Sequence, residues 1–174
     1  EHISMDEKTA LNTAKKLVRM AIANYKNRGE VYIPKQKQSA VGGFSFESIN
    51  YMLGGRFRAS FRPLNDNIIN GRIRGIVGVV GCTNPKMPQD LTHTTLTKEL
   101  IKRDILVLTT GCATIACGKQ GLTNPREALD LAGPGLREVC EAVGIPPVLA
   151  CGSCVDNTRL LVSCSELVRE GGLG

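Results

Sequence analysis

Short apolar runs recur three times along the chain, and each ends at a glycine-containing turn that carries a cysteine. The runs cover residues 76–80, 105–108 and 147–150. The cysteines that follow them are Cys82, Cys112 and Cys154. Runs of this length, rich in β-branched and aliphatic residues, are typical of buried parallel strands. We therefore predict that strand, turn and cysteine form a unit that the chain uses three times.

Apolar residues around these runs keep the spacing of amphipathic helices. The expected helices cover residues 6–27, 45–54, 63–71, 90–103, 127–131, 136–143 and 159–169, and a further helix begins at Cys112 and carries Cys117. Ser45 and Asp90 are of residue types that favour the N-cap position, and we expect them to cap the second and fourth of these helices. Strands that alternate with helices form a parallel sheet with right-handed crossovers. The pattern predicts an α/β fold, a Rossmann-like parallel sheet with flanking helices, preceded by a helical lead-in.

The same pattern suggests how the chain is divided. Residues 1–5 resemble a remnant of vector sequence, because they lead up to a methionine at Met5. Residues 6–64 form a helical lead-in and connector, and residues 65–174 form the Rossmann-like domain. The glycines near residue 174 resemble a linker that has been cut, so we expect this domain to be truncated at its C-terminus.

The positions of the three turn cysteines make them candidate metal ligands. The carboxyl ends of parallel strands meet at one edge of a sheet, so Cys82, Cys112 and Cys154 are expected to converge there. A thiol at a helix N-terminus is partly deprotonated by the helix dipole, and thiolates bind soft metals. A glycine-cysteine pair at a strand end can equally be a tight turn with a small side chain. The residues alone leave both interpretations open.

The other four cysteines and His93 are weaker candidates for metal ligands. Cys117, Cys140 and Cys164 fall within expected helices and are interpreted as structural, because free cysteine is among the most buried residue types. Cys151 forms a C-x-x-C with Cys154 that fits a redox pair or half of a zinc site, but a second C-x-x-C that would complete a zinc ribbon is missing. His93 lies on a helix face that we expect to be exposed and solvated, so we leave it out of the site.

Composition narrows the class of protein. The chain has 174 residues, 42% of them hydrophobic, and seven cysteines. The odd number of cysteines and the lack of a secretory leader favour a reducing, cytoplasmic compartment. No apolar run is long enough to span a membrane.

A net charge of +6 raises the question of a nucleic-acid partner. Arg56, Phe57 and Arg58, followed by Phe61 and Arg62, interleave basic and aromatic residues as a strand-binding surface does. The sequence contains no recognised nucleic-acid module, however, and we expect no nucleic-acid partner.

Five motifs together resemble one enzyme family. They are residues 81–86 (GCTNPK), 98–104 (KELIKRD), 110–113 (TGCA), 144–149 (GIPPVL) and 152–157 (GSCVDN). In their order and approximate spacing they resemble the catalytic subunit of anaerobic nickel-iron carbon monoxide dehydrogenases. Residues 31–34 and 42–45 also look like that family, so the resemblance covers nearly everything from Asp6 onward. The chain is similar to a fragment from the C-terminal half of that subunit.

This resemblance implies a cofactor, a reaction and partners. Cys82, Cys112 and Cys154 correspond to thiolate ligands of a nickel-iron-sulfur cluster that reversibly oxidises CO with water to CO2, two electrons and two protons. The resemblance also implies a ferredoxin-like iron-sulfur acceptor for the electrons, a homodimeric parent protein, and further 4Fe-4S clusters in parts of the parent outside this chain.

The resemblance also shows what cannot be mapped. Family members have further cluster ligands, including a histidine, before the part seen here and a catalytic lysine beyond it, so no catalytic residue is assigned in this chain. We therefore expect the chain to be an excised portion that is inactive alone. Two alternatives remain: a redox enzyme similar to the hybrid-cluster protein, or a non-catalytic α/β module that binds a small anion or another subunit at the same sheet edge.

Overall fold

The computed structural model describes residues 2–35, 37–54 and 60–171, and its contacts divide the chain into two compact units. The first unit covers residues 1–37 and the second covers residues 38–174. Arg56, Phe57 and Arg58 of the basic-aromatic segment lie outside the described residues.

The first unit is a single amphipathic helix with its flanking segments. Helix α1 (Ala10–Asn24) continues into a 3-10 turn (Tyr25–Asn27), which confirms the helix expected at residues 6–27 apart from its first turn. The residues before it form a turn in which the Thr9 N–H donates to Asp6 Oδ1 over 2.8 Å. None of the described helices is long and apolar enough to cross a lipid bilayer.

The second unit alternates helices and strands as the apolar pattern predicts. Its elements are α2 (Phe46–Gly54), α3 (Arg62–Ile69), β1 (Gly75–Val79), α4 (Leu91–Lys102), β2 (Ile105–Thr109), α5 (Gly111–Lys119), α6 (Pro125–Leu131), α7 (Pro134–Val143), β3 (Val148–Ala150), a 3-10 turn (Cys154–Asp156) and α8 (Asn157–Gly171). All three expected strands and all the expected helices are present, so the α/β fold is confirmed.

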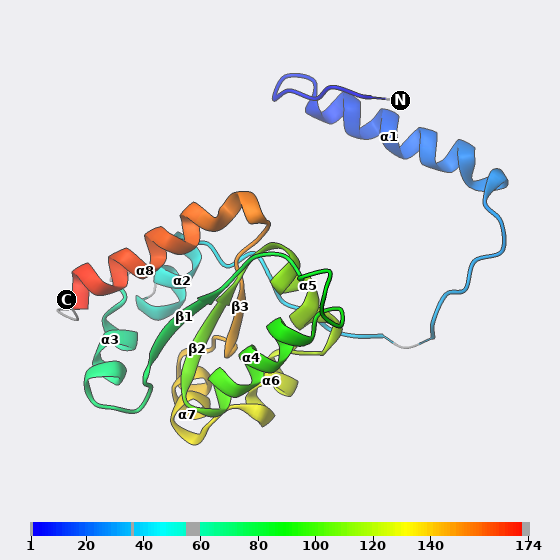
Figure 1. The fold of residues 1–174 in the computed structure, drawn as a ribbon. Coiled ribbons are helices and arrows are strands. Elements are labelled where there is room, and N and C mark those ends of the chain that lie inside the picture. Colours follow the sequence, from blue (N-terminus) through cyan, green and yellow to red (C-terminus); the bar gives the residue numbers. More distant parts are fainter. Residues whose placement is uncertain (1, 36, 55–59, 172–174) are drawn as a thin grey trace. The chain divides into compact units, whose positions relative to one another are not determined.

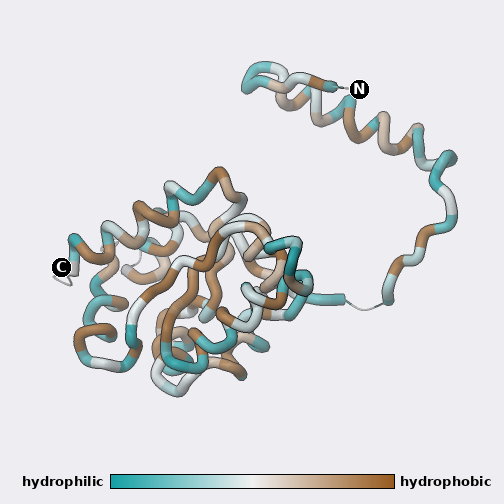
Figure 2. The backbone as a smooth tube through the Cα atoms, in the orientation of Figure 1, coloured by the Kyte–Doolittle hydropathy of each residue, from teal (hydrophilic) through white to brown (hydrophobic). Residues whose placement is uncertain are grey.

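A parallel sheet in the order β1-β2-β3 forms the centre of this unit. Val107 of the middle strand pairs with Val77 on one side and Val148 on the other. Helices α2, α3 and α8 group on one side of the sheet, and α4, α5 and α6 on the other (Figure 1). The middle strand is covered on both faces, so Leu106, Val107 and Leu108 are buried, and the strands are mostly brown in the hydropathy view (Figure 2).

The compact unit begins well before residue 65. Helix α2 packs against α3 and α8, and its side chains Ile49 and Leu53 are part of the core. The backbone N–H groups of Gly43 and Phe44 both donate to the carbonyl oxygen of Ala150, at 2.9 and 3.1 Å. Phe44, Ile49, Leu53, Phe61 and Leu64, which the sequence pattern placed in the lead-in, therefore contribute to the core around the sheet.

The two expected helix caps have different outcomes. Ser45 caps α2 as predicted, because its Oγ accepts the Ser48 N–H over 3.2 Å. The prediction for Asp90 is wrong: it stands at the N-cap of α4, but its side chain makes no capping hydrogen bond and its backbone is left-handed, with φ 66°. Its carboxylate instead bonds to Lys119 of α5, which lies far away in sequence.

Candidate metal centre

Three turns at the carboxyl edge of the sheet carry the cysteines that the sequence pattern singles out. Cys82 follows β1, Cys112 lies in the first turn of α5 directly after β2, and Cys154 begins the 3-10 turn after β3. All three side chains are exposed and none is in a disulfide. We call Cys82, Cys112 and Cys154 the rim cysteines, because the parallel strands bring them to one rim of the sheet.

Cys82 and Cys112 are in direct contact. Their sulfur atoms lie 3.7 Å apart, with the Cys112 thiol donating to Cys82. This hydrogen bond, followed by the nearby charge of a Cys82 thiolate, raises the pKa of Cys112 above its usual value. This direction is opposite to the lowered pKa expected of a thiol at a helix N-terminus. The Cys112 thiol proton lies between these two sulfurs. A metal cation in place of this proton would be stabilised by both sulfur atoms.

The Cys154 turn lies against the Cys112 turn through backbone contact at Gly111. The Gly111 N–H donates to the Gly152 carbonyl over 2.9 Å, and the Thr110 hydroxyl donates to Asn157 Oδ1. Gly111 is left-handed, with φ 57°, and a Cβ at this position would lie 3.2 Å from the Cβ of Cys154. Only glycine satisfies both the conformation and the space without strain.

The Cys154 turn also has its own internal support. Ser153 and Asp156 form a capping box, in which the Ser153 N–H donates to Asp156 Oδ2 over 2.9 Å. Within the described part of the chain, however, no three His, Cys, Asp or Glu side chains gather closely enough to hold a single metal ion. The rim thus presents one sulfur pair and a third thiol on the adjoining turn.

The remaining cysteines belong to the packed interior. Cys117 and Cys140 are buried and Cys164 is partly buried against the core, which confirms their structural interpretation. Burial raises the pKa of each of these thiols, and it raises the pKa of both Cys140 and Cys151 to about 12. Cys151 is buried and bonded to the Leu149 carbonyl, while Cys154 is exposed. The two thiols thus have different environments and do not form a disulfide.

His93 differs from its expected environment. Only 8% of it is exposed, and its Nδ1 has no hydrogen-bond partner among the described residues. The expectation of a solvated histidine is wrong, because the face of α4 that carries His93 packs inward. It does not join the rim cysteines in a metal-binding group of described residues.

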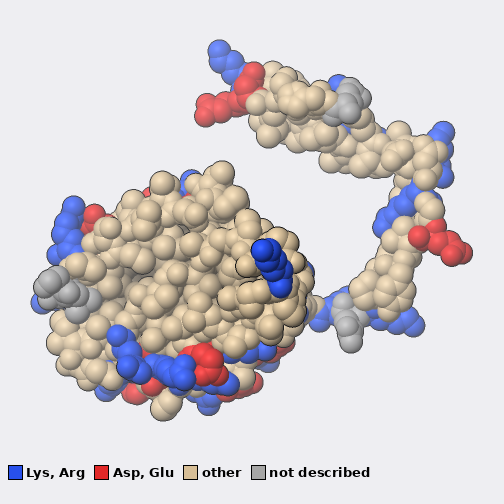
Figure 3. Space-filling model, in the orientation of Figure 1, with Lys and Arg blue, Asp and Glu red and all other residues tan. Residues whose placement is uncertain are grey.

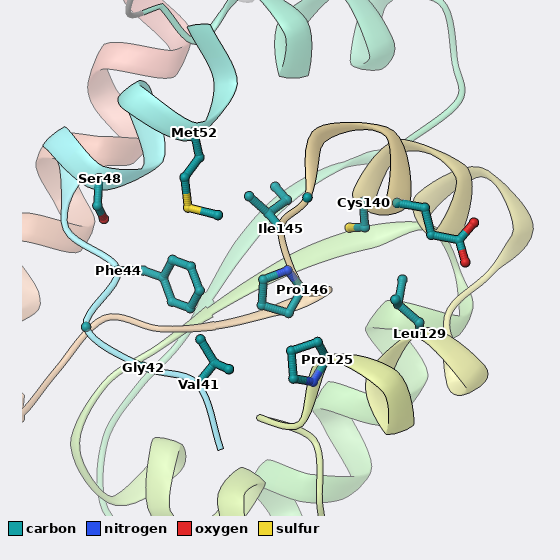
Figure 4. Close-up of a pocket in the computed structure, with 13 residues that line it drawn as sticks. Val41, Gly42, Phe44, Ser48, Met52, Pro125, Leu129, Cys140, Ile145 and Pro146 are labelled. Atoms are coloured by element: carbon teal, nitrogen blue, oxygen red, sulfur yellow. The ribbon is translucent and has the colours of Figure 1, made fainter. Parts of the chain in front are cut away.

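A second concave feature lies away from the rim. A cavity of about 610 Å³ opens between α2, the start of α6 and the segment before β3. Phe44, Met52, Ile145 and Pro146 surround it with apolar side chains (Figure 4). Sequence reasoning missed this cavity because its wall joins residues that are about a hundred positions apart. Among the described residues that line it, no rim cysteine appears.

Replacing Gly111 should loosen the contact between the Cys112 and Cys154 turns. We expect Gly111→Ala to lower the free energy of unfolding by about 1–2 kcal/mol, because alanine is strained in the left-handed region and its Cβ crowds Cys154. Gly118→Ala on the same helix is the matched control, since its Cβ would meet nothing closer than 3.5 Å. Urea denaturation measures both. Equal stability of Gly111→Ala and the unchanged chain would contradict this contact.

Removing the Cys82 sulfur should lower the pKa of Cys112. We expect Cys82→Ala to move the rise in Cys112 alkylation to lower pH, because the thiolate is the reactive form and its main perturbing neighbour is gone. Iodoacetamide labelling across a pH series, resolved by peptide mass spectrometry, measures this. Cys154→Ala serves as the control and should leave the profile in place. A profile that Cys82→Ala does not move would show that the two sulfurs are apart.

Comparisons with known proteins show the family of the chain. The family model described as Prismane/CO dehydrogenase family matches residues 1–174. Carbon monoxide dehydrogenase 1 of Methanosarcina mazei is 48% identical over 169 residues, which cover 96% of this chain and 26% of that protein. The chain therefore spans about a quarter of the length of this curated relative.

Solved structures lead to the same family. A nickel-free crystal structure of the carbon monoxide dehydrogenase from Thermococcus sp. AM4 aligns with a TM-score of 0.86 at 49% identity, covering 98% of this chain and 27% of that one. A structure of acetyl-CoA synthase/carbon monoxide dehydrogenase with nickel-containing [Fe4S4] clusters in its alpha subunits aligns with a TM-score of 0.81 at 35% identity, covering 98% and 27%. The chain belongs to the Prismane/CO dehydrogenase family.

Proposed function

We propose that the rim cysteines are thiolate ligands of a nickel-iron-sulfur cluster, in a protein that reversibly oxidises CO with water to CO2. The observation that carries this proposal is the exposure of Cys82, Cys112 and Cys154 at one sheet edge, with two of their sulfurs 3.7 Å apart. Relatives that are 48% and 49% identical to the chain are named carbon monoxide dehydrogenases, and this name supplies the reaction.

The residues present fit such a cluster. Thiolates are the usual protein ligands of iron-sulfur clusters, and the rim offers sulfur side chains that solvent and metal can reach. A cluster of several metal atoms does not need its ligands to converge on one ion, so a sulfur pair with a third thiol on the next turn is compatible with it. When bound, the cluster would supply the redox chemistry that converts CO and water to CO2, two electrons and two protons.

The chain's own residues position these sulfurs and release their protons. Gly111 lets the Cys112 and Cys154 turns approach, and the capping box of Ser153 and Asp156 shapes the second turn. Cysteines bind metals as thiolates, so loading the site must displace the proton that Cys112 donates to Cys82. The raised pKa of Cys112 means that, without metal, this proton stays bound at neutral pH.

The resemblance to carbon monoxide dehydrogenases also supports proposals about partners. We propose a ferredoxin-like electron acceptor, a homodimeric parent protein with further 4Fe-4S clusters, and a cytoplasmic location. We propose no nucleic-acid partner. In the second unit, Lys and Arg side chains alternate with Asp and Glu along the lower edge of the face in Figure 3, and most of that face is uncharged.

The alternative functions are not favoured. A redox enzyme similar to the hybrid-cluster protein is the nearer alternative, but relatives that are 48% and 40% identical to this chain are named carbon monoxide dehydrogenases. A non-catalytic α/β module would not require exposed thiols at the ends of all its strands.

Iron uptake tests the ligand assignment. After anaerobic reconstitution with iron and sulfide, we expect the chain to bind iron, and the triple variant Cys82→Ser, Cys112→Ser, Cys154→Ser to lose it, because serine is a poor ligand for iron-sulfur clusters. Cys164→Ser is the control and should retain iron, since Cys164 lies in the core region away from the rim. Iron and sulfide analysis of the purified proteins measures this. Unchanged iron in the triple variant would refute the assignment.

Activity of the chain alone tests a separate expectation. Because the chain spans 26% of its relative, we expect that it does not bind stoichiometric nickel or reduce a redox dye with CO. Nickel analysis and an anaerobic dye assay, run after reconstitution, provide the measurement. Full nickel loading with CO-dependent dye reduction would show that this portion is sufficient by itself.

A further inference from the structure

The loop between β1 and α4 is tied to α5 at both of its ends. At its start, the Cys82 sulfur lies 3.7 Å from that of Cys112, in the first turn of α5. At its end, Asp90 Oδ2 lies 2.8 Å from the Nζ of Lys119, in the last turn of α5. Cys112 and Lys119 are seven residues apart, so they share one face of α5 about 10 Å apart along its axis. The loop therefore runs along that face and is held at two points.

The Asp90 carboxylate also closes the loop on itself. Its Oδ1 accepts a hydrogen bond from the Gln89 side chain at 2.7 Å and a longer one from the Thr83 hydroxyl at 3.5 Å. Thr83 is the residue next to Cys82, so this carboxylate links the Lys119 contact to the cysteine end of the loop. Its side chain is only 14% exposed, and the hydrogen bond with Lys119 is the largest cause that lowers the pKa of Asp90. The carboxylate is thus ionised at neutral pH.

Local structure alone does not account for this arrangement. Aspartate is among the best N-cap residues, yet Asp90 forgoes the cap of α4 and adopts a left-handed backbone that non-glycine residues rarely use. The missing cap is locally unfavourable, and the carboxylate that could have made it contacts Lys119 instead. A residue with an unusual backbone and a specific long-range contact next to a candidate site is a reason to look for a functional role.

We propose that the Asp90–Lys119 ion pair is a positioning device that holds the Cys82 loop on α5, so that Cys82 and Cys112 form a paired thiol site before any metal binds. This inference deepens the proposed function, since it rests on these two cysteines acting as ligands. Asp90 and Lys119 touch neither the metal nor the reactants in this role; they act through the loop that carries Cys82.

The pairing of the two thiols can be measured without nickel or iron. Phenylarsine oxide is a suitable probe, because one arsenic atom forms bonds to two neighbouring sulfurs. The arsenic-oxygen bond breaks, two arsenic-sulfur bonds form, and the oxygen leaves as water with the two thiol protons, so no oxidant is needed. In the full chain carrying Cys154→Ser, the exposed thiols are Cys82 and Cys112. Competition with a small dithiol gives the dissociation constant.

We expect Asp90→Asn and Lys119→Met each to weaken arsenical binding about three- to tenfold. Asparagine tolerates the left-handed backbone, so Asp90→Asn removes the charge and keeps the turn. The double variant should be no weaker than either single variant, because both remove the same interaction. Lys119→Arg should retain tight binding. High salt should weaken binding by the Cys154→Ser chain but not by the charge-removing variants.

Lys98→Met is the matched control. Lys98 Nζ of α4 also reaches the end of α5, where it donates to Oε1 of the C-cap residue Gln120 over 3.3 Å, and its described hydrogen bond does not involve the Cys82 loop. It should leave arsenical binding unchanged. The Lys119 side chain is 55% exposed, so its replacement is not expected to prevent folding, and circular dichroism verifies this.

Three results would overturn the proposal. The first is equal arsenical binding by the Lys119→Met variant and by the Cys154→Ser chain from which it is made. The second is a loss of arsenical binding in Lys98→Met as large as that in Lys119→Met. The third is no arsenical binding by the Cys154→Ser chain itself. A failed cluster reconstitution with the arsenical effects intact would instead count against the proposed function alone.

Discussion

Parallel pairing of β1, β2 and β3 is the constraint on which the rest of the second unit depends. Because the strands run in one direction, the turns that follow them all emerge at the same rim, although Cys82 and Cys154 are far apart in sequence. Helices on both sides cover the sheet, and the apolar middle strand makes that arrangement stable. The fold thus gathers thiols without any local sequence signal that joins them.

Helix geometry then separates the cysteines that face solvent from those that support the core. On α5, Cys112 lies at the exposed N-terminal turn, whereas Cys117, five residues later, faces inward and donates to Thr97. After β3, Cys151 still belongs to the buried strand end, and Cys154 lies on the exposed turn that follows. Exposure to solvent therefore divides the same residue type into candidate ligands and inert packing groups. Binding of a soft metal requires the first kind.

Much of this fold could be predicted from short-range patterns. The apolar runs before Cys82, Cys112 and Cys154 are visible in the sequence because a strand of this length needs only local apolar residues and a turn to end it. The helix that Ser45 caps could be predicted for the same reason, since the capping hydrogen bond joins residues only three positions apart. The resemblance of five motifs to carbon monoxide dehydrogenases led to the family that the comparisons show, while the ligand roles of the cysteines stay predictions.

The features that sequence reasoning missed depend on contacts between distant residues. From the sequence Asp90 is a helix cap, but in the structure its carboxylate accepts a hydrogen bond from Lys119, 29 residues away. The burial of His93 follows from how α4 packs, and the raised pKa of Cys112 follows from the approach of Cys82. A local pattern contains no information about these partners. Each of these misses concerns the side chain's surroundings and not the element that carries it.

The central claim is that three sulfurs from three separate turns hold one metal cluster. An anaerobic crystal structure of the complete protein, with anomalous scattering recorded at the iron and nickel absorption edges, tests it most directly. The account predicts metal peaks within bonding distance of the sulfurs of Cys82, Cys112 and Cys154. Iron and nickel held elsewhere in the protein, with these three thiols unbound, would contradict it.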